Sequence, residues 1–506
     1  MVLPHSLPLV PLPAAAVVRE GRMPITAATR VHGDSPAAGI LIDAVARRAG
    51  FRPVRAEASE TPQPGDVVLR LEDAIPASEA YSLRVGEHAQ ISGADEAGLF
   101  YGVQTLLQLL RDDEGWSVPH VDVDDAPRFP HRGVMLDVVR HFFSVAEVKT
   151  FIDATSALKL NRLHLHLTDD QGWRLQIDSW PRLTELSSSS AADGDPGGFY
   201  TKDDYREIVA YAASRHMVVI PEIDLPGHTH AIGVAYPDLV EAPVLNDGLV
   251  QQAESMGQPL PVAGEVYTGW GVGHSSVRIR EERTYDFVRD VVREVAEMTP
   301  GPYIHIGGDE SLGTTQEDFD HFVERATRIV TDAGKIPVAW HEVGAAEDIA
   351  EGTVGQYWGL TVPRGTHAAE AAHFVERRGS LIMSPADATY LDMKYSEDFP
   401  LGLTWAAIID VRRAYEWEPT AVLDVADDAI LGVEAPLWSE TARTLEDVER
   451  LVFPRVAAEA EVAWSPREAP GREWESFRGR LGAQAPLWKA EGIRFHPAAE
   501  IPWSDR

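Results

Sequence analysis

The 506-residue sequence contains no cysteine. Disulfide bonds, thiolate metal sites and a cysteine nucleophile are therefore excluded. Basic residues are scarce, 45 against 79 acidic ones, and the formal net charge is −34 at pH 7. This charge argues against nucleic acid or an anionic membrane as a partner, because phosphate groups are bound by basic surfaces. No apolar run approaches the roughly 20 residues that a membrane-spanning helix needs.

The sequence also lacks a visible secretory signal, because Met1 to His5 show no basic segment followed by a long apolar stretch. This favours a cytoplasmic location, or secretion if a leader has been removed. The composition, 44% hydrophobic and 25% charged, is typical of a soluble globular protein. The length is too great for one ordinary domain and suits two.

The N-terminal part alternates short β-like runs with polar turns. Residues 67–71 and 81–85 are predicted strands, and residues 97–110 have the apolar spacing of a helix. The acidic, proline-containing stretch 122–130 then indicates a boundary. We expect a small α+β domain over residues 1–126 and a second domain over residues 127–506.

Beyond the boundary, apolar strands alternate with helical stretches. The predicted strands are 133–138, 162–168, 217–223, 303–306, 336–340, 353–357, 380–384 and 430–435, and the predicted helices include 145–159, 201–215, 316–333, 366–377 and 445–462. Eight strands in this alternation predict a (β/α)8 TIM barrel. Three long insertions, 186–200, 231–282 and 385–428, follow strands, which would place them at the C-terminal face where barrel enzymes keep their active sites.

The most informative motif is the run His305 to Glu310, in which two glycines precede the adjacent carboxylates Asp309 and Glu310. Neighbouring side chains on a strand point to opposite faces, so the pair can serve one ligand only if the backbone turns, which the glycines allow. Two carboxylates held together repel each other, and this raises the pKa of one of them. Such an acid beside an anion suits hydrolysis of a glycosidic bond.

Further polar and aromatic side chains follow the other predicted strands. They include Arg140, Asp169, His228, Trp340, Trp358, Tyr390, Asp392, Trp438 and Glu440, and Trp405 lies in the third insertion. Indole faces pack on sugar rings and charged groups bind hydroxyls, so this collection favours a sugar site. His164 and His166 alternate with leucines, and we expect both imidazoles to fill the barrel interior through hydrogen bonds.

In order along the chain, these motifs resemble glycoside hydrolase family 20, the β-N-acetylhexosaminidases. The resemblance is carried by Arg132–Asp137 with Arg140-His141, His164–Arg174, Pro221–Thr229, His305–Glu310, Tyr390–Asp392 and Trp438–Glu440, and by Gly98–Leu106 in the smaller domain. It implies exo-acting, retaining hydrolysis of terminal β-linked N-acetylglucosamine or N-acetylgalactosamine, in which the substrate's acetamido oxygen attacks the anomeric carbon. No metal and no cofactor are implied, and the expected partner is a carbohydrate.

The resemblance also implies a role for each residue. Glu310 is the general acid and base, and Asp309 holds the acetamido N–H. Tyr390 donates to the acetamido oxygen, while Trp340, Trp358 and Trp438 wall the methyl pocket. The remaining expected substrate-binding or supporting residues are Arg140 and Glu440 for outer hydroxyls, Asp392 near C6, Asp169 and His228 behind the acid, and Trp405 as a platform for the next sugar.

The chain departs from the family pattern at His341, where many members carry an acidic residue directly after the tryptophan. Three alternatives also stay open. Histidines at 164, 166, 228, 230 and 305 could hold the metal of an amidohydrolase on the same barrel. A non-catalytic sugar-binding protein would keep the tryptophans but would not need Glu310. A conventional retaining glycosidase would carry its own nucleophile and cleave β-glucosides as well.

Overall fold

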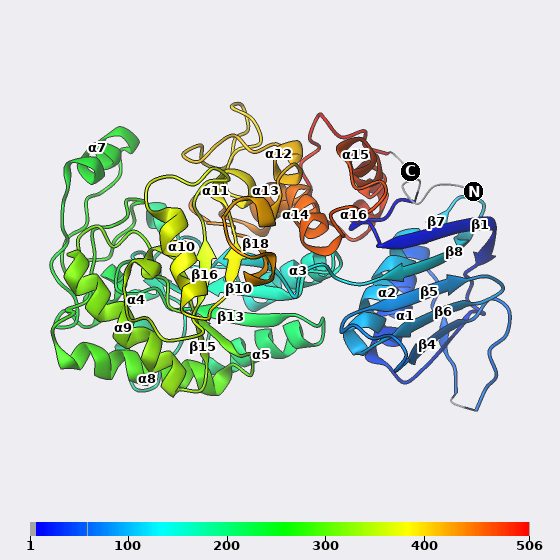
Figure 1. The fold of residues 1–506 in the computed structure, drawn as a ribbon, viewed down its shortest axis with the longest axis horizontal. Coiled ribbons are helices and arrows are strands. Elements are labelled where there is room, and N and C mark those ends of the chain that lie inside the picture. The colour runs from blue at the N-terminus through cyan, green and yellow to red at the C-terminus, as the bar shows by residue number, and fades with distance from the viewer. Residues whose placement is uncertain (1–6, 58, 505–506) are drawn as a thin grey trace.

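The structure, a computed structural model, describes residues 7–57 and 59–504. It contains an N-terminal sheet domain beside a larger barrel domain (Figure 1). The first sheet has the order β1-β8-β5-β6-β4-β2-β3, with β7 paired to β8. Its strands are β1 Ala15–Pro24, β2 Arg30–His32, β3 Val54–Arg55, β4 Val67–Leu71, β5 Tyr81–Val85, β6 Ala89–Gly93, β7 Arg111–Asp112 and β8 Trp116–Asp125.

Two helices, α1 (Pro36–Ala49) and α2 (Glu96–Leu109), cover the face of this sheet that is turned toward the barrel (Figure 1). Alternation places Tyr81, Leu83 and Val85 of β5 in the core beneath them. The strands predicted at 67–71 and 81–85 and the helix predicted at 97–110 are confirmed. The small α+β domain therefore has the predicted composition.

The larger domain is a closed barrel of eight parallel strands, in the order β10-β13-β14-β15-β16-β17-β18-β9. The strands are β9 His131–Asp137, β10 Arg162–His166, β13 Val218–Glu222, β14 Tyr303–His305, β15 Ile336–Trp340, β16 Val354–Tyr357, β17 Leu381–Met383 and β18 Ile430–Ala435. Each falls within a predicted run or begins a few residues from it, and the predicted TIM barrel is confirmed. The apolar runs were informative because these strands are buried on both faces.

The helices around the barrel match most of the predicted ones, with ends that differ by a few residues. They are α3 Val145–Ser156, α5 Lys202–Ala213, α8 Glu282–Met298, α9 Gln316–Asp332, α10 His367–Glu376, α13 Leu445–Val452 and α14 Arg455–Trp464. The single helix predicted over 445–462 is wrong. Two helices form instead, because Pro454 has no N–H to continue the hydrogen-bond ladder and the residue before it is pushed toward extended backbone.

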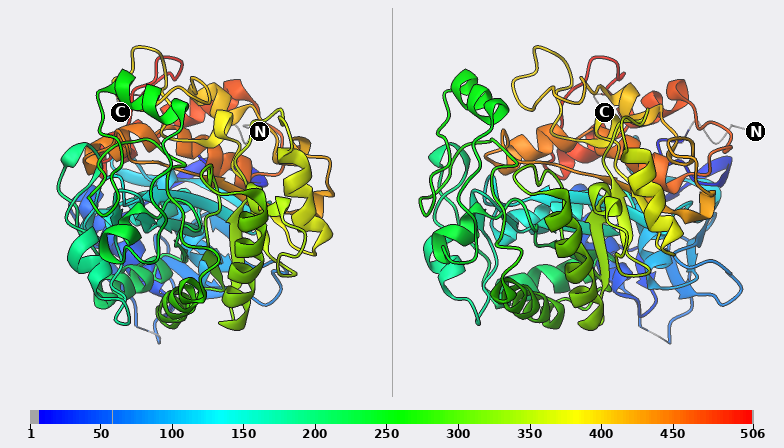
Figure 2. Two further views of the ribbon diagram at one scale, coloured as in Figure 1. Left: turned by 90° about the vertical axis from the view of Figure 1, so that its left-hand side faces the viewer. Right: turned by 60° about the vertical axis from the view of Figure 1, so that its left-hand side comes forward.

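The predicted insertions hold little regular structure. The second contains α7 (Asp247–Met256), and the third contains α11 (Ala386–Thr389) and α12 (Val411–Tyr415). The N-terminal domain contacts the beginnings of β9 and β10, so the strands run away from it and α7 lies at the opposite end of the molecule (Figure 1). Figure 2 turns this end toward the viewer and shows loops gathered around it.

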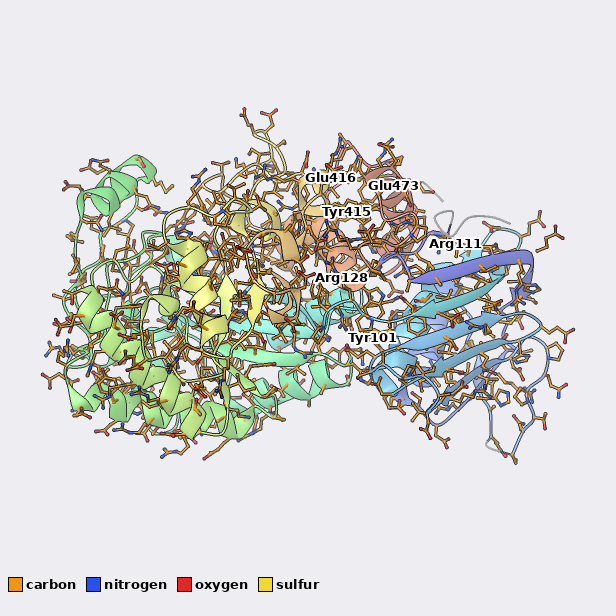
Figure 3. All side chains as sticks on the ribbon, in the orientation of Figure 1. Tyr101, Arg111, Arg128, Tyr415, Glu416 and Glu473 are labelled. Atoms are coloured by element: carbon orange, nitrogen blue, oxygen red, sulfur yellow. The ribbon has the colours of Figure 1, made fainter. Side chains whose placement is uncertain are left out.

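A buried polar contact joins the two domains. The Lys159 ammonium lies 2.8 Å from Asp125 Oδ2, and the Trp464 indole donates to both oxygens of that carboxylate at 3.0 Å. Trp464 closes α14 of the barrel domain, yet its ring lies in the hydrophobic core of the N-terminal domain. Tyr101 of α2 packs against it, at the junction visible in Figure 3. The boundary between residues 126 and 127 stays a prediction, because the hydrophobic core of the N-terminal domain contains residues from both sides of this boundary.

Further contacts tie the first described residues to the C-terminal helices α15 (Trp474–Gly482) and α16 (Ala485–Ala490). Leu12 N–H donates to Glu461, which in turn is paired with Arg480 at 2.6 Å. The first described residues therefore pack against the C-terminal helices. Over the part of the chain that the structure describes, no helix combines the length and apolar character that a membrane crossing needs.

Candidate active site

The carboxylate pair sits on a tight turn that follows β14. Gly307 and Gly308 have φ of 67° and 101°, and Glu310 itself has φ of 46°. A Cβ on Gly307 would lie 1.7 Å from Asp224 Oδ1, and one on Gly308 would lie 2.3 Å from Val343 Cγ2. Only glycine fits at both positions. The turn that the sequence predicts is therefore present, and it presents both carboxylates at the C-terminal end of the barrel.

His228 lies between the two carboxylates on the loop after β13. Its Nε2 atom is 3.8 Å from Asp309 Oδ2 and 3.7 Å from Glu310 Oε2, while its Nδ1 atom is 3.1 Å from Asp169 Oδ1. Burial alone would lower the pKa of His228, but Asp169, Asp224 and Asp309 around it raise that pKa well above the usual value. The imidazole is thus positioned as a cation between carboxylates.

Asp169 connects this histidine to the rest of the site. Its Oδ2 atom lies 2.8 Å from Arg140 Nη2 and 2.8 Å from His166 Nε2. Burial would raise the pKa of Asp169, yet Arg140 and His228 hold it well below its ordinary value. A fixed anion therefore stands behind His228, and a chain of charged contacts runs from Arg140 to the carboxylate pair Asp309 and Glu310.

Glu310 has the properties of a proton donor. Its restricted contact with water and the charge of Asp309 raise its pKa from 4.5 to about 7. The Glu310 side chain is 34% exposed, whereas the Asp309 side chain is only 10% exposed and its Oδ1 atom has no hydrogen-bond partner. A buried carboxylate oxygen that no protein group satisfies is suited to accept a hydrogen bond from a ligand.

Five of the predicted aromatic side chains form one continuous group. Trp340 and Trp438 have ring centroids 6.0 Å apart, and Tyr390 lies 6.5 Å from Trp438. Trp405 contacts both Trp358, at 5.9 Å, and Tyr390, at 5.7 Å. Trp340 is fully buried, whereas Trp405 is 54% exposed. The structure thus brings the predicted aromatic residues together, with Trp405 on the outside.

Asp392 and Glu440 add polar atoms on the side of Arg140. Glu440 Oε1 lies 4.0 Å from Arg140 Nε, and the guanidinium group stands over the Trp438 ring at 4.9 Å. Both oxygens of the buried Asp392, together with Glu440 Oε2 and Arg140 Nε, lack hydrogen-bond partners. Buried polar atoms normally find partners, so this group is suited to a ligand rich in hydroxyls.

The sequence reasoning missed three carboxylates of the site. Asp224 accepts a hydrogen bond from Gly308 N–H at 3.1 Å, and burial together with Asp309 raises its pKa well above the usual range. Glu222 accepts from the Trp340 indole at 2.9 Å, and Glu342 accepts from the Trp358 indole. The only signal was their position at predicted strand ends, in motifs already noted, because their partners come from other strands.

The buried histidines pair with carboxylates, as predicted for polar filling of the barrel. His164 lies 2.8 Å from Glu434 and 3.1 Å from Glu222, and His166 lies 2.5 Å from Glu222. Burial would lower the pKa of His164, but these two glutamates raise it to about 9. His164, Glu222 and His305 are close enough to be considered as metal ligands. An imidazolium ion has no lone pair for a metal, so the contacts of His164 with the two glutamates are better described as ion pairs, while burial lowers the pKa of His305.

Barrel, carboxylate pair and aromatic wall together define a glycoside hydrolase site, and comparisons with known proteins specify it. The model of the catalytic domain of glycosyl hydrolase family 20 matches residues 129–318 and 311–467, and that of the family's domain 2 matches residues 6–126. The chain belongs to glycosyl hydrolase family 20 and is a β-N-acetylhexosaminidase. The metal-dependent amidohydrolase and the non-catalytic sugar-binding protein are thereby excluded as descriptions of this chain.

Individual relatives agree. The β-N-acetylhexosaminidase of Cellulomonas fimi is 40% identical over 488 residues, which cover 95% of this chain and 93% of that protein. A solved family 20 β-N-acetylglucosaminidase is 52% identical, with a TM-score of 0.91 over 98% of this chain and 99% of its own. The Streptomyces plicatus N-acetyl-β-hexosaminidase, solved with thio-NAglucal, is 43% identical, with a TM-score of 0.89 and 98% of each chain covered.

Proposed function

We propose that this enzyme removes terminal β-linked N-acetylglucosamine or N-acetylgalactosamine from the non-reducing end of glycans, with retention, and that the substrate's acetamido oxygen is the nucleophile. The observation that carries the proposal is the pairing of Glu310, with its pKa near 7, and Asp309, with its unsatisfied buried oxygen. The first supplies a proton, and the second supplies an acceptor for the acetamido N–H.

In the first step, Glu310 gives its proton to the glycosidic oxygen as the acetamido oxygen bonds to the anomeric carbon. The C–O bond to the leaving group breaks, and an oxazolinium ion forms. Asp309 accepts a hydrogen bond from the acetamido N–H and stabilises the positive charge that develops on that group. In the second step, Glu310 takes a proton from water, which attacks the anomeric carbon and restores the acetamido group.

Tyr390, Trp340, Trp358 and Trp438 form the proposed acetamido pocket. Burial, together with Asp309 and Asp392, raises the pKa of Tyr390 well above 10, so its hydroxyl keeps its proton and can donate to the acetamido oxygen. The indoles enclose the methyl group and exclude water, which would otherwise compete with the acetamido oxygen. A sugar without the N-acetyl group has no nucleophile and leaves this pocket unfilled.

The remaining residues bind the rest of the sugar or support the pair. The unsatisfied atoms of Arg140 and Glu440 suit the outer hydroxyls of the terminal sugar, and Asp392 suits a hydroxyl near C6. Asp169 holds the His228 imidazolium next to Asp309 and Glu310. The exposed ring of Trp405 suits the next sugar of a chitooligosaccharide or glycan.

Two sets of p-nitrophenyl glycosides test this mechanism in the presence of EDTA. We expect strong turnover of the β-N-acetylglucosaminide and none of the β-glucoside. Replacing the acetyl group by fluoroacetyl, difluoroacetyl and trifluoroacetyl groups should lower kcat progressively, because fluorine withdraws electrons from the attacking oxygen. Equal turnover of glucoside and N-acetylglucosaminide, or a rate insensitive to fluorine, would indicate a nucleophile supplied by the protein.

A further inference from the structure

Glu342 is an acidic residue of the site to which the proposed mechanism gives no role. It follows β15, two residues after Trp340, and its side chain contacts the indole of Trp358. The Trp358 indole N–H points at both carboxylate oxygens of Glu342, at 3.0 and 2.9 Å. One short segment therefore carries one wall of the proposed acetamido pocket and the acceptor that holds another.

The tryptophans differ in how firmly they are held. Trp340 is fully buried, and its indole N–H is bound by Glu222. Trp358 is only partly buried, and its contacts with Trp405 and His341 are ring-edge contacts at 5.9 and 5.6 Å. Edge contacts between rings permit rotation about the side-chain bonds. The bond to Glu342 is thus the directional contact that fixes the plane of the Trp358 indole.

His341 leaves Glu342 available for this bond. Its ring is fully buried, and burial together with His367 lowers its pKa to about 3, so it is neutral. Its Nδ1 atom is 3.3 Å from Glu342 Oε2, but neither ring nitrogen makes a hydrogen bond. Glu342 is the sole carboxylate of the short helical turn His341–Ala345 that follows Trp340.

We propose that Glu342 is a positioning residue that fixes the Trp358 indole and thereby sets the size of the N-acyl group that the enzyme accepts. This inference rests on the proposed function of the acetamido pocket and assigns the residue that maintains the pocket's shape. Without the carboxylate, the indole is free to rotate outward. The pocket then encloses acetyl less tightly and admits a longer acyl chain.

The experiment compares kcat and KM for p-nitrophenyl glucosaminides that carry N-acetyl, N-propionyl and N-butyryl groups. In Glu342→Ala we expect kcat/KM for the N-acetyl substrate to fall about tenfold, the change expected for loss of one buried hydrogen bond. Turnover of the N-butyryl substrate should fall much less, so that the preference for acetyl narrows. Glu342→Gln keeps an acceptor oxygen and should retain most of the preference.

Two controls separate positioning from general damage. Glu370→Ala removes another partly buried glutamate close to His341, one that bonds Thr366 and not the indole, and it should leave the acyl preference unchanged. Trp358→Phe has no indole N–H, so adding Glu342→Ala to it should change the preference little further. Calorimetric binding of N-acetylglucosamine gives a readout without catalysis, and its Kd should rise about tenfold in Glu342→Ala.

The assignment is overturned if Glu342→Ala lowers kcat/KM equally for all three substrates, or if Glu342→Ala and Glu342→Gln have the same acyl preference. It is also overturned if adding Glu342→Ala to Trp358→Phe changes the acyl preference as much as Glu342→Ala alone. If Glu342→Ala does not fold, Glu342→Gln is compared with Trp358→Phe instead. The quantity compared is the ratio of kcat/KM for the N-acetyl substrate to kcat/KM for the N-butyryl substrate. Failure of the proposed mechanism appears differently, because the unaltered enzyme would then cleave the β-glucoside as well.

Discussion

At the scale of single residues, the proposed mechanism depends on the raised pKa of Glu310. Water reaches it only in part, and Asp309 stands next to it on the same turn. Both influences disfavour the ionised form, and its pKa of about 7 lets it hold a proton at neutral pH. The sequence predicted this pair because Gly-Gly before two carboxylates is a turn signal, and the family resemblance implied Asp169 and His228 behind it, whereas the contact of Asp224 with Gly308 came only from the fold.

Glu310→Gln should lower kcat by a factor of about 10² to 10⁴, because the amide cannot give a proton to the leaving oxygen. Substrates with acidic leaving groups, such as dinitrophenyl glycosides, should be affected least, since they leave without a proton. Steady-state kinetics over a series of aryl leaving groups checks this. Equal losses on good and poor leaving groups would contradict the assignment of Glu310 as the acid.

The pH profile should have a basic limb near pH 7. The raised pKa of Glu310 means that the carboxyl is protonated below about 7 and ionised above it, so the proton-donating form is lost as the pH rises. Activity on an alkyl N-acetylglucosaminide should therefore decline above neutrality. In Glu310→Gln the remaining activity should lack this limb, and a limb that survives the substitution must belong to another group.

At the scale of elements, the backbone of the turn after β14 determines where the carboxylates of Asp309 and Glu310 lie. Gly307 has a positive φ and no room for a Cβ beside Asp224. Sequence patterns located this turn and the eight strands because buried parallel strands produce apolar runs. They did not locate the contacts of Glu222 or Glu342, since these link different strands and leave no periodic trace. The break at Pro454 was likewise hidden by apolar spacing that continues across it.

Gly307→Ala should remove most activity at a modest cost in stability. The new Cβ would displace Asp224, whose carboxylate holds the Gly308 N–H, and with it the catalytic pair. We expect kcat/KM to fall by about two orders of magnitude or more, in line with a displacement of about 1 Å at a reacting centre. Kinetics and thermal unfolding should be measured together.

Gly334→Ala is the matched control for this substitution. Gly334 also has a positive φ, of 76°, but a Cβ there meets no atom within 4 Å. The Gly334→Ala substitution should lower the free energy of unfolding by only about 1 kcal/mol, the cost of a positive φ for alanine, and should leave kcat and KM unchanged. Similar kinetic losses in both variants would mean that the turn at Gly307 has no special role.

At the scale of the whole molecule, a buried ion pair holds the two domains together. Lys159 is 2% exposed and depends on Asp125 for compensation of its charge, while Asp125 also binds the Tyr81 hydroxyl and the Trp464 indole. Removing one partner of a buried pair leaves the other charge without compensation. The domains are therefore expected to lose stability together.

Asp125→Asn should lower the thermal midpoint more than Lys159→Met. The first leaves a buried ammonium beside an amide, at a cost of about 3–5 kcal/mol, whereas the second leaves a carboxylate that two other side chains still bind. Thermal unfolding followed by circular dichroism and by activity measures both. A larger effect of Lys159→Met would show that the carboxylate, and not the ammonium, is the group that needs its partner.

Trp464 has a consequence for the order in which the molecule is made. Its indole fills the core of the N-terminal domain, although about 340 residues of barrel separate it from β8 in the sequence. During synthesis the N-terminal domain leaves the ribosome first, as N-terminal domains generally do. The core of the N-terminal domain therefore lacks the Trp464 indole until α14 has been synthesised. The earlier of these two domains is thus completed only once α14 has been made, and a chain that stops before α14 lacks part of both domains.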